Sequence, residues 1–145
     1  MSRKYFTKYN LELVKDESVQ YNGKITNRAE AYNKFLEVFK LDRKPEEYMV
    51  MFSLNNKNDI NGAFMIAKGG INEISFSIQN IIKRALLCNG TKILIAHNHP
   101  SGDPTPSIID IRTTRKIKEA CELLGIEFLD HFVIGENCFM NVSIG

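Results

Sequence analysis

Residues 97–110 of this 145-residue chain read HNHPSGDPTPSIID, and the expected fold and site both follow from this stretch. His97 and His99 are two positions apart, so in an extended segment their side chains point the same way and can bind one metal ion together. Asp110 follows one loop later, in the first turn of an expected helix, where its carboxylate can complete the set. Two imidazoles and one carboxylate are typical ligands of a catalytic zinc ion, whose fourth position holds a water with a pKa of about 7. We therefore expect Zn²⁺ on His97, His99 and Asp110.

The spacing of the whole stretch is more informative than the histidine pair. A His-x-His pair alone is a weak signal, because histidines occur in loops for many reasons. Here seven residues follow the pair, then Ser107, two more residues and Asp110, and a free arrangement of these residue types would seldom give that order. Asn98 between the histidines suggests an HNH nuclease, but in those enzymes the three residues are spread along a ββα motif. The spacing therefore favours a metal site of another kind.

The pattern His-x-His-x7-Ser-x2-Asp resembles the JAMM motif of the MPN-plus metallopeptidases. The longer string HNHPSGDPTPS, with Asp130-His131 downstream, is similar to the RadC branch of that family, and the resemblance covers roughly residues 45–142. It implies an α/β fold of the JAB/MPN (cytidine-deaminase-like) type, with a curved mixed sheet flanked by helices. It also implies a zinc-dependent hydrolase acting on a peptide or isopeptide bond. The name RadC further implies a link to DNA repair.

The resemblance also implies a glutamate near the metal, which this family often carries as Pro-x-Glu before a strand. Pro45-Glu46-Glu47 precedes the apolar run 48–54, and this match assigns the role to Glu47, with Glu46 as the substitute. A glutamate beside a metal-bound water can take its proton and later pass it to a leaving amine. On the residues alone, surface positions flanking a strand are the better explanation of both glutamates.

Ser107 has two expected roles. Its hydroxyl can cap the helix that begins here. It can also donate a hydrogen bond to the oxyanion that forms when hydroxide attacks a carbonyl, and the family resemblance supports this second role. The two roles do not exclude each other. We do not expect a serine nucleophile, because the histidines are better occupied by metal.

Two further residues are candidates for supporting the site. Asp103, four residues after His99, is a rival to Asp110 as the third ligand, although a Gly-Asp-Pro stretch is more typical of a turn. His131 lies at an expected strand start and can orient a metal ligand through a hydrogen bond, or line the cleft. A partly buried structural histidine explains His131 equally well.

Outward from this stretch, hydrophobic periodicity predicts helices and strands interleaved in one α/β domain. Asn27, with Glu30 at capping-box spacing, begins a first helix that ends before Pro45. Ser107 opens the last helix, which stops at Gly125. The other expected elements are strands at 48–54, 60–67, 92–96, 126–134 and 139–142, a middle helix through 78–86 and a loop at 97–106.

Residues 1–24 are expected to form an arm separate from a RadC-like JAB/MPN domain at 25–145. In the arm, Leu11 and Leu13 alternate with polar neighbours, which suggests a strand, and Asn22-Gly23 is typical of a turn. The arm can pack on the domain or mediate formation of a homo-oligomer. RadC proteins usually carry an N-terminal helix-hairpin-helix module that contacts DNA, and the short arm weakens a direct DNA role here.

The composition predicts a soluble globular protein, with 43% hydrophobic and 25% charged residues. Its three cysteines include no CxxC pair, which favours a reduced, intracellular protein. The sequence shows no signal-peptide pattern and no run of about 20 apolar residues, so we expect a cytoplasmic protein without a membrane partner. A formal net charge of +2 says little about nucleic acid. Basic residues do gather between 112 and 118, at Arg112, Arg115, Lys116 and Lys118.

Three functions are compatible with these observations. The first is a zinc-dependent hydrolase that cleaves an amide bond in an unidentified peptide or isopeptide substrate. The alternative is a DNA-repair-associated accessory or DNA-binding protein without hydrolase activity. The third is a scaffold that kept the fold but not the activity, and the intact ligand set argues against it.

Overall fold

The structure is a computed structural model that describes residues 2–10, 12–20, 24–69 and 74–144. These residues form three α-helices, one short 3₁₀ helix and five strands. The elements are α1 (Arg28–Phe39), η1 (Leu41–Arg43), β1 (Tyr48–Leu54), β2 (Ile60–Lys68), α2 (Ile74–Leu87), β3 (Lys92–Asn98), α3 (Ile108–Leu123), β4 (Glu127–Ile134) and β5 (Phe139–Asn141).

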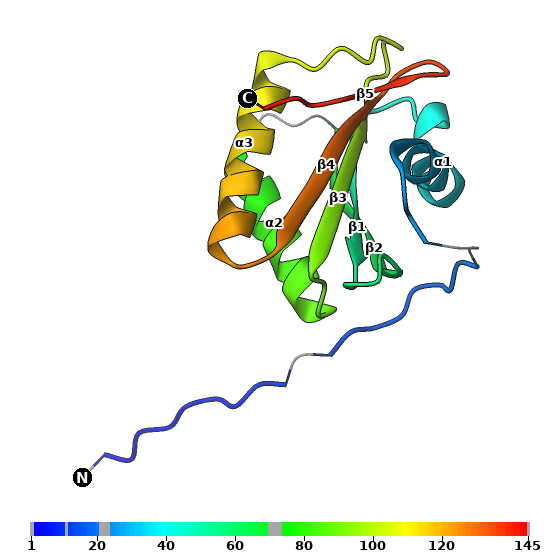
Figure 1. Ribbon diagram of the computed structural model, residues 1–145. Coiled ribbons are helices and arrows are strands. Elements are labelled where there is room, and N and C mark those ends of the chain that lie inside the picture. The colour runs from blue at the N-terminus through cyan, green and yellow to red at the C-terminus, as the bar shows by residue number, and fades with distance from the viewer. Residues whose placement is uncertain (1, 11, 21–23, 70–73, 145) are drawn as a thin grey trace.

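The five strands form one mixed sheet in the order β2-β1-β3-β4-β5. β3 and β4 are parallel, whereas the other neighbouring pairs are antiparallel. A parallel pair needs a crossover connection, and α3 supplies it between β3 and β4. α1 covers one face of the sheet, while α2 and α3 cover the other (Figure 1). The expected mixed α/β fold with flanking helices is therefore confirmed.

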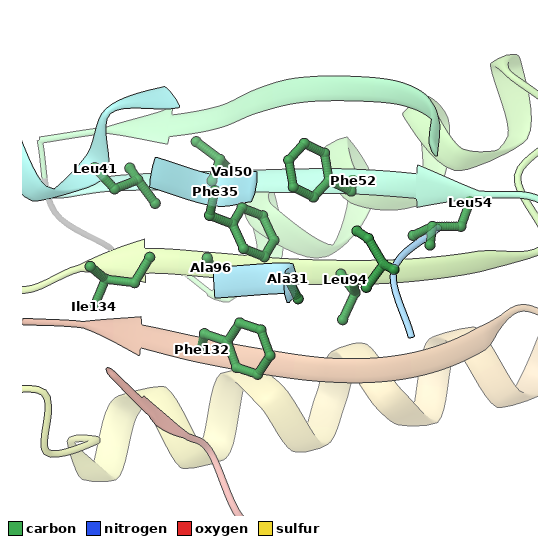
Figure 2. Close-up of a cluster of buried hydrophobic side chains, with 11 residues drawn as sticks. Ala31, Phe35, Leu41, Val50, Phe52, Leu54, Leu94, Ala96, Phe132 and Ile134 are labelled. Carbon is green, nitrogen blue, oxygen red and sulfur yellow. The ribbon is translucent and has the colours of Figure 1, made fainter. Parts of the chain in front are cut away.

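The face under α1 is held by aromatic packing. Asn27 caps α1 by accepting from the Glu30 amide, which fixes where the helix begins. The helix then buries Phe35 against Phe52 of β1, with ring centroids 4.4 Å apart, and against Phe132 of β4 at 6.0 Å (Figure 2). Burial of large rings of this kind is among the strongest stabilising contributions a small core has.

On the other face of the sheet, the alternation of side chains along β3 places His97 at the candidate site. In β3, Ile93 and Ile95 are fully buried in the core that also includes Ile117 and Cys121 of α3. Because side chains alternate along a strand, His97 continues this row toward α3, and Asn98 lies on the α1 side with Ala96.

Two expected elements differ from the structure. The loop was predicted to begin at His97, but β3 continues to Asn98 because both neighbouring strands pair with it, through Met49 of β1 and Ile134 of β4. The expected strand in the arm is absent from residues 2–10 and 12–20, where the chain is exposed and has no regular structure. An extended segment becomes a strand only when a neighbour pairs with it. Leu11 and the predicted Asn22-Gly23 turn lie outside the described residues.

Within the described ranges, no helix combines the length and the apolar character needed to cross a membrane.

Candidate metal centre

Four side chains converge where β3 ends and α3 begins. Glu47 precedes β1, His97 lies near the end of β3, His99 follows that strand, and Asp110 is in the first turn of α3. Each offers one ligand atom, and these four atoms all lie within 4.8 Å of one another. Residues from three separate segments of the chain thus meet at one point, as the sequence led us to expect for the histidines and Asp110.

The spacing between these atoms fits a single small cation. His97 Nε2 lies 3.1 Å from His99 Nε2 and 3.2 Å from Asp110 Oδ1. His99 Nε2 lies 3.2 Å from Asp110 Oδ2. Ligands about 2.0–2.1 Å from a tetrahedral zinc are themselves roughly 3.3 Å apart. The three measured distances are close to this value, with each histidine facing a different oxygen of the Asp110 carboxylate. The two nitrogens and one carboxylate therefore fit a metal ion in both chemistry and spacing.

The cluster is open on one side. His97 is fully buried and the Asp110 side chain is only 6% exposed, whereas His99 is 19% and Glu47 25% exposed. Glu47 Oε1 lies 3.6 Å from His97 Nε2, slightly farther than the other pairs. His97 and Asp110 are thus anchored in the protein, and the side toward His99 and Glu47 is partly exposed to solvent.

Asp110 is held as a carboxylate. Burial alone raises its pKa, but the adjacent His97 ring and the hydrogen bonds at Ser107 outweigh burial and hold this pKa well below its usual range. An ionised carboxylate is the form that binds a metal ion.

Ser107 and Asp110 form a reciprocal capping box at the start of α3. The Asp110 amide donates to Ser107 Oγ at 3.0 Å, and the Ser107 amide donates to Asp110 Oδ2 at 2.8 Å. This arrangement fixes the Asp110 carboxylate on the side facing the histidines. Ser107 is exposed and its oxygen acts as an acceptor here, so its own hydroxyl proton is free for another group.

His99 is oriented by the loop that follows it. Its Nδ1 lies 2.8 Å from the carbonyl oxygen of Asp103, which can only accept, so Nδ1 carries the proton and Nε2 presents its lone pair to the cluster. The Asp103 carboxylate itself accepts from the Thr105 amide and is not part of the cluster. The structure thus brings the backbone of Asp103, and not its side chain, to the site.

A buried polar chain lies behind His97. His97 Nδ1 is 2.7 Å from His131 Nε2, and His131 Nδ1 is 2.7 Å from Thr114 Oγ1. Thr114 Oγ1 in turn donates to the carbonyl oxygen of Asp110 at 2.7 Å. His131 is fully buried, and burial lowers its pKa well below the ordinary value, so its ring is neutral.

Asn98 positions Glu47 from the opposite face of the sheet. Its side-chain oxygen accepts from the Tyr48 amide at 2.8 Å, and its side-chain nitrogen donates to the Glu46 carbonyl at 2.9 Å. These two contacts hold the backbone on either side of Glu47. The Glu46 carboxylate is exposed, lies 3.9 Å from Lys68 Nζ and does not join the cluster.

Sequence reasoning missed the positioning contacts of Asn98 and Thr114. In the sequence, Asn98 suggests only the middle residue of an HNH motif, although its place next to His97 on β3 puts it on the opposite face of the sheet. Thr114 gave no signal, because a threonine on the buried face of a helix is ordinary.

The family of this chain follows from its similarity to known proteins. A family model described as RadC-like JAB domain matches residues 25–144. The chain belongs to the RadC-like JAB domain family. The predicted family is therefore confirmed.

This RadC-like chain is also similar to curated proteins named UPF0758 protein. It is 42% identical over 105 residues to the one from Carboxydothermus hydrogenoformans, which covers 72% of this chain and 46% of the relative. It is 35% identical over 120 residues to the one from Enterococcus faecalis, covering 83% and 51%. The chain spans about half the length of these relatives. Their names state no activity, so the roles of the site residues stay predictions.

Proposed function

We propose that this RadC-like JAB domain is a zinc-dependent hydrolase that cleaves an amide bond in a peptide or isopeptide substrate. The observation that carries the proposal is the convergence of Glu47, His97, His99 and Asp110 within 4.8 Å, in a cluster with one accessible side. Zinc suits this donor set because it prefers imidazole nitrogen and carboxylate oxygen in four-coordinate sites. When bound there, zinc would polarise the substrate carbonyl and supply an activated water at neutral pH.

In this proposal, the position of each residue in the cluster assigns it either to metal binding or to proton transfer. His97, His99 and Asp110 would hold the metal, since the distances among their nitrogen and oxygen atoms, 3.1–3.2 Å, are the shortest in the cluster. Glu47 is slightly more distant and partly exposed, which suits a group that accepts a proton and later delivers it to the leaving amine.

Ser107 would stabilise the developing negative charge on the substrate oxygen. Its oxygen accepts from the Asp110 amide, and this bond does not use the hydroxyl proton, which can be donated to the substrate. The amino end of α3 lies at the same place, and the helix dipole there also favours negative charge.

Two variants test this assignment. Glu47→Gln keeps the size of the side chain but removes the base, and Glu46→Gln is the matched control outside the cluster. We expect all three proteins to bind about one zinc ion. Zinc-loaded wild type and Glu46→Gln should cleave a mixed library of internally quenched peptides or lysine isopeptides, whereas Glu47→Gln should be slower by about 100-fold or more. Equal rates for the two variants, or a zinc-loaded wild type that cleaves neither library, would contradict the proposal.

A DNA-associated role is the second candidate, favoured by the surface of α3. Arg112, Arg115 and Lys116 are exposed along this helix. Binding of single-stranded or branched DNA over a salt series tests it. Affinity that falls steeply with salt and is weakened by Arg112→Ala and Arg115→Ala supports the candidate, whereas no binding at low salt removes it.

A further inference from the structure

The buried chain behind His97 has no part in the reaction proposed above, yet it ends on a metal ligand. It runs from the Asp110 carbonyl through Thr114 and His131 to His97 Nδ1, and each of its three contacts is 2.7 Å long. His97, Thr114 and His131 are all completely buried, so water does not compete for these groups.

The direction of the chain follows from the chemistry of its first member. A carbonyl oxygen can only accept, so the single hydroxyl proton of Thr114 is donated to Asp110. Thr114 Oγ1 can then act only as an acceptor toward His131, which requires the proton on His131 Nδ1. His131 Nε2 is left as an acceptor, so the proton between the two rings belongs to His97 Nδ1.

We propose that Thr114 and His131 are positioning residues that fix His97 in its Nδ1-protonated form, so that the Nε2 lone pair faces the metal position. The inference rests on the proposed metal centre but not on the reaction. If the chain ran in the opposite direction, His97 Nε2 would carry a proton, which would have to leave before a metal could bind there. The backbone carbonyl of Asp110 thus determines which nitrogen of His97 carries the proton, while the Asp110 carboxylate faces the metal position.

The two histidine ligands reach the same form by different routes. For His99, the carbonyl of Asp103 accepts directly from Nδ1. For His97, a second ring and a hydroxyl transmit the same preference from Asp110. Such partners of metal-bound histidines typically change metal affinity by about 10- to 100-fold when they are removed.

Two neighbouring threonines of α3 provide the test variants and their matched control. Thr114→Val removes the hydroxyl with little change in shape, and Thr114→Ser restores it. Thr113→Val is the matched control, because Thr113 is also buried on α3 and its hydroxyl has no hydrogen-bond partner among the described residues.

The first measurement is the tautomer itself, by nitrogen NMR of zinc-free protein labelled at histidine. The chain has three histidines, so all of their ring nitrogens can be assigned. We expect the proton of His97 on Nδ1 in wild type, Thr113→Val and Thr114→Ser, and a mixture of the two forms in Thr114→Val. A wild-type His97 protonated on Nε2 would overturn the inference even if Thr114→Val failed to fold.

The second measurement is zinc affinity, by competition with a chromogenic chelator. Thr114→Val should bind zinc about 10- to 100-fold more weakly than wild type, with Thr113→Val and Thr114→Ser close to wild type. Equal affinities for Thr114→Val and Thr113→Val would overturn the inference. If the zinc and NMR results are as expected but no amide bond is cleaved, only the proposed function fails. If Glu47-dependent cleavage is found while Thr114→Val binds zinc normally, only this inference fails.

Discussion

At the scale of single residues, the candidate site depends on backbone groups as much as on side chains. Carbonyl oxygens of Asp103 and Asp110 act on the two histidines, and the Ser107 amide holds the Asp110 carboxylate. The helix and the loop fix these backbone atoms, so the ligand atoms of the side chains are in place before a metal ion binds. Preorganisation of this kind lowers the cost of binding.

Asp110→Asn is the sharpest change to the ligand set, because it removes the charge and keeps the shape. The amide oxygen of asparagine can still accept from the Ser107 amide, so α3 should remain capped. We expect zinc affinity to fall by about 100-fold or more with little loss of stability. Chelator competition and thermal unfolding check this, with Asp103→Asn as the control outside the cluster. Similar zinc affinities for the two variants would argue against Asp110 as a ligand.

Asn98→Ala should separate catalysis from metal binding. The change leaves the Tyr48 amide and the Glu46 carbonyl without their partner, which costs about 1–3 kcal/mol of stability. Glu47 then loses its fixed place, and we expect cleavage to slow on the order of 100-fold while zinc content stays near one equivalent. Steady-state rates and metal analysis test this. An unchanged rate would mean that Glu47 is positioned by other contacts.

At the scale of elements, capping residues close in sequence predicted where helices begin, whereas pairing between strands determined where β3 ends. The caps at Asn27 and Ser107 are formed by residues close in sequence, so both helix starts could be predicted. The end of β3 could not, because its last residues are strand only through their partners on β1 and β4. The expected pairing of the two histidines is unaffected by this difference, since their Nε2 atoms lie 3.1 Å apart although His99 follows the strand. The contacts of Thr114 depend on how α3 packs on β4, which no local pattern encodes.

Cys121 reports on the packing of α3 against the sheet. Burial, helped by the negative charge of Glu122, raises the pKa of this thiol from 9.0 to about 11. In the folded protein we therefore expect iodoacetamide at pH 8 to modify the exposed Cys138 and to spare Cys121, as judged by mass spectrometry. After unfolding in guanidinium, both should react.

The raised pKa of Cys121 also makes the free energy of unfolding decrease at alkaline pH. The folded protein keeps the Cys121 proton where the unfolded chain has lost it, so stability is full below pH 9 and falls as pH rises toward 11. At about 1.4 kcal/mol per pKa unit the loss is at most about 3 kcal/mol. Cys121→Val should lack this component when unfolding free energies at pH 8 and pH 10.5 are compared. An equal fall in both proteins would contradict the burial argument.

At the scale of the whole molecule, two cores on opposite faces of one sheet support the site from both sides. Asn98, whose contacts lie on either side of Glu47, is buried on the α1 side of the sheet, and His97, His131 and Asp110 are buried on the α3 side. The mixed α/β class could be predicted from periodicity and from the motif. The division of the site between the two faces could not, because it depends on the register of β1 against β3.

The arm should contribute little to the stability of this body. Residues 2–10 and 12–20 are exposed throughout, including Tyr5, Phe6 and Tyr9, each more than 80% exposed. We expect deletion of residues 1–20 to change the free energy of unfolding by no more than about 0.5 kcal/mol and to leave zinc affinity unchanged. Denaturant titration of both proteins checks this, and a loss of several kcal/mol would show that the arm packs on the domain.

The most direct test of the central claim is a crystal structure grown with one equivalent of zinc, with anomalous diffraction recorded at the zinc absorption edge. The account predicts one strong peak about 2.0–2.1 Å from Nε2 of His97 and His99 and about 2.0–2.2 Å from an Asp110 oxygen, with Glu47 beside its open side. No peak at these residues, or a peak held by another set of side chains, would contradict it.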